Sequence, residues 1–144
     1  MTAFLLSVHV IAAIVLIGPV TVATSLFPRY AREGNTAVVD ALHRISRVYA
    51  VLGVSVPAFG LATGAAMGVL GDAWLIVSIL LTAGAAALLA LVVLPGQSRA
   101  VAALHADGTT AASPRLATAS GVFALTWAVV VVLMIVRPGS TTGV

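Results

Sequence analysis

The chain contains no cysteine and no lysine among its 144 residues, and only 8% of its residues are charged. The absence of cysteine excludes disulfides, thiolate metal centres, iron–sulfur clusters and thiol nucleophiles. The shortage of charge excludes an ordinary soluble domain, in which about 25% of residues are charged because the surface must stay solvated. Since 61% of the residues are hydrophobic, most of the surface must face lipid.

Four windows of the sequence contain no Lys, Arg, Asp or Glu: residues 1–28, 48–71, 73–98 and 116–136. Each window is long enough to cross a hydrocarbon core of about 30 Å as a helix. In lipid, every backbone N–H and C=O must be paired, and the alternating strands of roughly 10 residues that build a membrane β-barrel are absent here. The sequence therefore predicts an all-α polytopic membrane protein, a bundle of four transmembrane helices.

We expect a single domain over residues 1–144. The first window is interpreted as a retained helix rather than a cleaved signal peptide, because no basic residue precedes it and its apolar run exceeds the 7–15 residues typical of a signal. The expected helices cover about residues 3–27, 36–70 with an interfacial segment at its start, 73–95 and 114–137, and the tail 138–144 is expected to be disordered.

The arginines predict the orientation. Six of the seven lie in the two longer connections, at positions 29, 32, 44 and 47 and at positions 99 and 115, and only Arg137 follows the fourth helix. The positive-inside rule therefore places both connections in the cytoplasm and both termini outside. We expect Arg29, Arg32, Arg44 and Arg47 to set the topology and to contact anionic lipid headgroups. No nucleic-acid-binding module accompanies them, so nucleic acid is not an expected partner.

Three glycines follow Pro57 at intervals of four residues: Gly60, Gly64 and Gly68. This spacing gives one helix a smooth face on which another helix can pack closely. The sequence leaves open whether that neighbour belongs to the same chain, to a second copy or to a larger membrane complex.

Catalytic chemistry has no obvious carrier in this sequence. The predicted spans contain no acid and no basic residue except His9, whereas transporters usually carry ionisable groups within the membrane. No hydrolase, zinc-protease or phosphate-loop motif is present, so we expect no enzyme activity, no catalytic residue and no clustered metal site. The preferred interpretation is a non-enzymatic membrane protein that acts through helix packing, as an accessory or assembly subunit or as a homo-oligomer. A small-molecule transporter is the weakest alternative.

His9 carries the main alternative. An imidazole within the membrane must hydrogen-bond or ligate something, because an unpaired polar group there costs several kcal/mol. Its functional interpretation is a ligand to a b-type haem or to copper, in electron transfer or metal handling. Its structural interpretation is a packed histidine bonded to Ser78, Thr63 or a carbonyl. The absence of any cofactor remains the default expectation.

The other polar side chains receive structural interpretations. His43 is expected to be a solvated interfacial residue on the cytoplasmic side, and Asp40 is expected to pair with Arg44 one helical turn away. His105 and Asp107 are expected in an exposed polar turn rather than in a metal site. Trp127 falls near the middle of the fourth helix, where its N–H requires a partner in the bundle or a ligand.

The segment from His9 to Gly18, the Pro28-Arg29 pair and the Leu94-Pro95 pair resemble the small four-helix bacterial membrane proteins of the DUF2269 type. More distantly, the chain is similar to the membrane domain of the CopD copper-resistance family, in which this segment reads His, six residues, Trp and then Gly-Gly. Leu16 and Pro19 depart from that pattern, so the resemblance transfers at most His9 as a ligand. Together with abundant Ala and Val and no Lys, it implies the inner (plasma) membrane of a bacterium.

Overall fold

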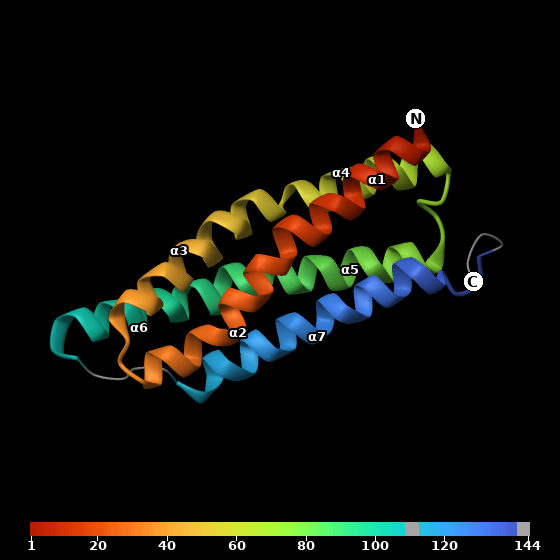
Figure 1. The fold of residues 1–144 in the computed structure, drawn as a ribbon. Coiled ribbons are helices and arrows are strands. Elements are labelled where there is room, and N and C mark those ends of the chain that lie inside the picture. Colours follow the sequence, from red (N-terminus) through yellow and green to blue (C-terminus); the bar gives the residue numbers. More distant parts are fainter. Residues whose placement is uncertain (109–112, 141–144) are drawn as a thin grey trace.

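The structure is a computed structural model that describes residues 1–108 and 113–140. Within those residues it is helical without strands, and four stretches are long and apolar enough to cross a membrane: Thr2–Arg32, Thr36–Met67, Ala73–Asp107 and Pro114–Val136. Figure 1 shows them running alongside one another as an elongated bundle. The prediction of an all-α fold with four transmembrane helices is confirmed.

The first three spans are built from shorter helical elements. In chain order the elements are α1 (Thr2–Ala12), η1 (Ala13–Ile17), α2 (Gly18–Arg32), α3 (Thr36–Gly53), α4 (Ser55–Met67), α5 (Ala73–Leu88), η2 (Leu89–Val93), α6 (Leu94–Asp107) and α7 (Pro114–Val136). The elements η1 and η2 are single π-helical segments that join the α-helices on either side.

Prolines explain these interruptions. Proline lacks a backbone N–H, and its ring collides with the carbonyl four residues earlier in a regular helix. Pro19 lies two residues after the end of η1 and Pro95 two residues after the end of η2, so a wider π turn precedes each ring and relieves the collision. In the second span Pro57 removes the usual donor for the Gly53 carbonyl, and α3 ends at Gly53.

Several helix boundaries differ from the expected ones. The first span continues through Pro28 to Arg32 rather than stopping near residue 27, and the third continues through Pro95 to Asp107 rather than stopping at 95. A proline in a helix costs one backbone hydrogen bond, and the turns on either side of it keep theirs. The second span ends three residues early, because Gly68 adopts φ +70° and caps α4.

The fourth span agrees with expectation to within one residue, since Arg137 has φ +45° and ends α7. Of the tail expected to be disordered, residues 138–140 form a turn in which the Ser140 N–H donates to the Arg137 carbonyl at 3.0 Å. Residues 141–144 lie outside the described part of the chain.

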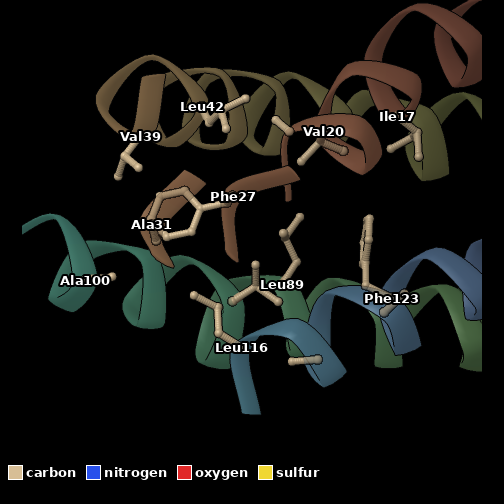
Figure 2. Close-up of a cluster of buried hydrophobic side chains, with 14 of the residues drawn as sticks. Ile17, Val20, Phe27, Ala31, Val39, Leu42, Leu89, Ala100, Leu116 and Phe123 are labelled. Carbon is tan, nitrogen blue, oxygen red and sulfur yellow. The ribbon is translucent and has the colours of Figure 1, made fainter. Parts of the chain in front are cut away.

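The hydrophobic core occupies one half of the bundle. Figure 2 shows it between α2, α3, α6 and α7, with the Phe27 ring at its centre. Its most enclosed large side chains include Val20, Val39 and Val93, each fully buried. We call this half the inner half, because the arginines of α2, α3, α6 and α7 lie at its end.

The outer half of the bundle is divided into two pairs of helices. Element α1 packs on α4, and α5 packs on α7. Contact between these two pairs is small and consists mainly of a few residues of α4 against α5. Figure 1 shows the two pairs diverging toward the N-terminus. In consequence α1 contains no buried residue, and many of its apolar side chains are exposed, which in a membrane means that they contact lipid.

Candidate functional site

A cleft of about 1200 Å³ separates the two helix pairs in the outer half. All four spans line it, and small residues make much of its wall: Ala13, Gly18, Gly60, Ala83, Ala86, Ala124 and Ala128. The cleft is open at its sides, since lining residues such as Ile14 (67% exposed) and Ile135 (61% exposed) also face outward. A volume of this size is sufficient for a lipid-soluble molecule, since pockets for small ligands measure roughly 300–1,000 Å³.

His9 lies in the wall that α1 contributes to this cleft. Its Nδ1 is 2.9 Å from the carbonyl oxygen of Val56 on α4. Because a carbonyl oxygen only accepts hydrogen bonds, Nδ1 carries the ring proton, and Nε2 of the neutral imidazole is left as an acceptor. Nε2 has no hydrogen-bond partner among the described residues. One nitrogen of His9 therefore holds α1 on α4, and the other is available to a ligand.

Gly60 makes this position of the imidazole possible. A Cβ atom built on Gly60 would lie 2.8 Å from Cε1 and 3.2 Å from Nδ1 of His9. Any larger residue at position 60 would collide with the ring, so α4 provides a seat for His9 only because it carries glycine there. Pro57 of α4 also lines the cleft, one turn before Gly60.

Two further polar side chains line the cleft without hydrogen-bond partners among the described residues. They are Thr82 on α5 and Trp127 on α7. The hydroxyl groups of Thr21 and Thr63, by contrast, each donate to the carbonyl four residues earlier, at 2.8 and 2.7 Å. The cleft therefore collects one free acceptor, one free hydroxyl and one free indole N–H from three different helices.

At its outer rim the cleft meets Arg137. The guanidinium lies over the ring of Trp74 at 5.5 Å, and its Nε donates to the Met134 carbonyl at 3.2 Å. The Trp74 indole in turn donates to Asp72 at 3.0 Å. Arg137 is the one charged residue that lines the cleft within the described part of the chain.

We call Gly60, Gly64 and Gly68 the glycine stripe. Other residues of the same chain cover its two helical members, Gly60 and Gly64. Gly60 lies against His9, and a Cβ on Gly64 would meet Leu75 at 3.0 Å and Leu70 at 3.2 Å. Gly68 does not belong to the stripe in space, because its positive φ ends the helix and nothing lies within 4 Å of a Cβ built on it.

A second group of polar side chains lies between α3 and α6 in the inner half. His43 Nδ1 donates to Oε1 of Gln97 at 3.0 Å, and the Gln97 amide donates to Ser46 Oγ at 3.2 Å. Gln97 is fully buried, and the His43 ring packs edge-on against Phe27. His43 is thus part-buried and hydrogen-bonded, which differs from the solvated residue expected from sequence. The amide partner lies 54 residues away, and a periodicity argument cannot find it.

Asp40 also has a different partner from the one expected. Its carboxylate oxygens are 2.9 and 3.0 Å from Nε2 of His105, which α6 brings across from the third span. The expected pairing of Asp40 with Arg44 is not formed, because the α3 face that carries Asp40 packs on α6. In the described residues, no three His, Cys, Asp or Glu side chains lie close enough to hold a metal ion.

The arginines expected to set topology lie at the end of α2 and in the middle of α3. Arg29 Nε is 3.0 Å from the Glu33 carboxylate, and the two side chains form an ion pair one helical turn apart. Both side chains are well exposed, so the pair contributes little to stability. The inner end therefore presents guanidinium groups where anionic headgroups would lie.

Comparison with known protein families gives a match over most of the chain. A family described as "Predicted integral membrane protein (DUF2269)" matches residues 3–138. No curated protein and no solved structure matches the chain significantly. The matched region extends from the first turn of α1 to the residue after the end-cap of α7, and so includes all four spans, His9 and the cleft. The chain belongs to the DUF2269 family of integral membrane proteins.

Proposed function

We propose that this membrane protein is non-enzymatic and binds a lipid-soluble ligand in the cleft between the α1–α4 and α5–α7 pairs. The observation that carries the proposal is the free Nε2 of His9 on the wall of an apolar cleft of about 1200 Å³. In lipid an unpaired polar group costs several kcal/mol, so a ligand that satisfies it has a clear advantage over an acyl chain.

The shape of the molecule also favours a ligand. The inner half is tightly packed around Phe27, whereas the outer half leaves α1 without a buried residue. Small side chains on the cleft walls keep the helix pairs from filling the space themselves. A bundle that served only as a packing unit would be expected to close both halves.

The proposal that the protein acts through helix packing, as an accessory subunit or homo-oligomer, receives less support. Its main sequence feature was the glycine stripe, and Gly60 and Gly64 are covered by His9, Leu70 and Leu75 of the same chain. A helix of a second copy or of a partner in the cleft remains an alternative outcome of the experiment below. A transporter is supported least, because no acid lines the cleft within the described residues.

A specific observation favours haem b or copper as a second candidate. Histidines that ligate metals usually donate their other ring N–H to a carbonyl or carboxylate, which fixes the tautomer. His9 has this arrangement through Val56, so Nε2 would be the one ring nitrogen able to hold the metal. Bound haem would supply electron-transfer chemistry. The other two histidines bond to groups at the inner end and give no second ligand in the cleft.

The test is native mass spectrometry of the protein taken from its own membrane in mild detergent. We expect a retained small-molecule mass in the wild type. Ala83→Leu, which fills the cleft, should lower the occupied fraction at least about five-fold. Ala87→Leu is the matched control, because Ala87 is an exposed residue of the same helix that does not line the cleft.

An absorption spectrum of the same sample separates the candidates. A Soret band, or stoichiometric copper, that disappears in His9→Phe but persists in His105→Phe would favour the second candidate. If the wild type and Ala83→Leu retain identical masses, or if the retained mass is a second copy of the chain, the ligand proposal is wrong.

A further inference from the structure

The polar groups of the cleft define a narrower class of ligand, and this inference rests on the proposed function. His9 Nε2, the Thr82 hydroxyl and the Trp127 N–H have no partner among the described residues. They come from α1, α5 and α7, and none of the three is bonded to a backbone carbonyl of its own helix. A ligand that meets all three must therefore present its own polar group between the helix pairs.

The three groups lie at a similar depth. His9 is seven residues from the outer end of its span at Thr2, Thr82 is nine residues from Ala73, and Trp127 is nine residues from Val136. At 1.5 Å per residue these separations correspond to roughly 10–14 Å. We call these three groups the polar layer. Because half of the hydrocarbon core is about 15 Å thick, the polar layer lies deep in the membrane, toward its middle.

This depth excludes a charged headgroup. Transfer of an ion into hydrocarbon costs far more than a hydrogen bond returns, and among the residues that the structure describes no acid lies in the cleft to balance a cation. Arg137, the one charged residue that lines the cleft in the described part of the chain, is at the outer rim and already contacts Trp74 and Met134. An ordinary phospholipid would keep its headgroup at that rim, and could reach the polar layer only with its acyl chains.

The tautomer of His9 sets the direction of the hydrogen bond. Nδ1 donates to Val56, so Nε2 accepts, and a ligand must supply an O–H or N–H donor to it. The Trp127 indole only donates and therefore needs an acceptor on the same ligand. A hydroxyl group meets both requirements because it donates one hydrogen bond and accepts others.

We propose that the cleft binds a neutral lipid whose buried headgroup carries a hydroxyl group, which donates to His9 Nε2 and accepts from both the Trp127 N–H and the Thr82 hydroxyl. Two sources have this chemistry. One is an aromatic hydroxyl, as in an isoprenoid hydroquinone, and the other is an aliphatic alcohol, as in a diacylglycerol. Both place an apolar chain along the small-residue walls and a neutral hydroxyl in the polar layer.

The experiment measures binding of three probes to the full chain in lipid nanodiscs by native mass spectrometry. The probes are a short-chain isoprenoid hydroquinone, its bis-O-methyl ether and a short-chain diacylglycerol. The ether retains the shape of the hydroquinone but has no donor for Nε2. We expect the hydroquinone or the diacylglycerol to bind at least about five-fold more tightly than the ether, the factor that one net hydrogen bond supplies. The tighter of the two identifies the source.

Variants locate the effect. His9→Phe should abolish the preference for hydroxyl over ether, and Thr82→Val should weaken the hydroxyl probe about five-fold. Thr21→Val is the matched control, because Thr21 lines the same cleft but its hydroxyl is already bonded to Ile17. Because His9→Phe also removes the hydrogen bond to Val56 and can disturb the fold, Thr82→Val provides an independent test of the same ligand contact.

Binding of the ether by the wild type as tightly as both hydroxyl probes would overturn the hydroxyl inference while leaving the proposed cleft intact. Equal losses in Thr82→Val and Thr21→Val would also overturn it. A Soret band on the native protein would assign His9 to a metal instead. Failure of the proposed function has a different signature, namely that Ala83→Leu does not change the binding of any of the three probes.

Discussion

At the scale of the residue, His9 and Gly60 depend on each other although 51 positions separate them. The imidazole lies against the bare backbone of Gly60 and bonds to the Val56 carbonyl one turn earlier. Gly60→Ala should displace the ring and break this bond, which lowers the free energy of unfolding by about 1–3 kcal/mol. Thermal unfolding in detergent measures the change.

Gly121→Ala is the control for Gly60→Ala. Gly121 is also helical, but a Cβ there meets nothing within 4 Å, so alanine should be neutral or should stabilise α7 by up to about 1 kcal/mol. Equal destabilisation by both substitutions would contradict the close contact between Gly60 and His9.

Gln97 is the second residue whose substitution has a defined outcome. Its amide joins His43 on one side to Ser46 on the other, and the side chain is fully buried. Gln97→Leu keeps the approximate volume but leaves the His43 N–H without its acceptor, at a cost of about 1–3 kcal/mol. We expect the double variant Gln97→Leu/His43→Leu to recover part of that loss in a denaturation experiment. No recovery would mean that the two residues are not coupled.

His9 could be identified from the sequence, but the residues that surround it could not. It was identifiable because it is the single ionisable side chain in the first charge-free window. Its carbonyl partner was one of the structural alternatives, but the contact with Gly60 depends on the rotation of α1 against α4, which spacing does not determine. The Asp40–His105 and His43–Gln97 contacts were missed for the same reason, because each joins two spans that are distant in sequence.

At the scale of the element, the π segments are the least predictable feature and the most testable. A π turn closes its hydrogen bond to the fifth rather than the fourth residue, so it holds one residue more than an α turn. Deleting Leu91 from η2, together with Pro95→Ala, should convert η2 into regular α-helix and keep α6 in register with Gln97 facing α3. We expect this variant to fold and to unfold cooperatively.

The comparison for that variant is the deletion of Leu80 from α5 in the same Pro95→Ala background. Because α5 has no extra residue to lose, this deletion rotates the preceding turns by about 100° and moves apolar residues away from their contacts. If both deletions destabilise the protein equally, η2 does not act as a single-residue insertion.

The sequence predicts that four membrane helices exist, but it does not predict where each helix continues through a proline. The four charge-free windows correspond to the four spans, because lipid leaves the backbone no other solution. Pro95 was expected to end the third helix, and the structure continues to Asp107 because η2 accommodates the ring. Hydropathy cannot distinguish a proline that ends a helix from one that a π turn absorbs.

At the scale of the whole molecule, the lack of cysteine makes the predicted orientation easy to test. A single introduced cysteine is the sole target for a maleimide. Gly71→Cys lies in the exposed turn between α4 and α5 and should react with a membrane-impermeant maleimide on intact cells. Ala106→Cys lies exposed near the end of α6 and should react only after permeabilisation. The reverse pattern would invert the topology.

The shape of the molecule follows from an unequal distribution of side-chain size between the two halves of the bundle. Large buried side chains are concentrated in the inner half, as Figure 2 shows, whereas alanine, glycine and lone polar groups line the outer half. Composition predicted the bundle but not the opening between its helix pairs, because hydropathy does not determine how closely two helices approach each other. Figure 1 shows the resulting divergence.

The sideways opening of the cleft determines which concentration governs binding. A ligand that enters through the open side of the cleft comes from the surrounding bilayer and need not pass through water. Its occupancy then depends on its mole fraction among the lipids, and diluting the suspension with buffer leaves that fraction unchanged. Titrations at constant ligand-to-lipid ratio but different bulk volumes should therefore superimpose, as they would not for a site that is filled from the aqueous phase.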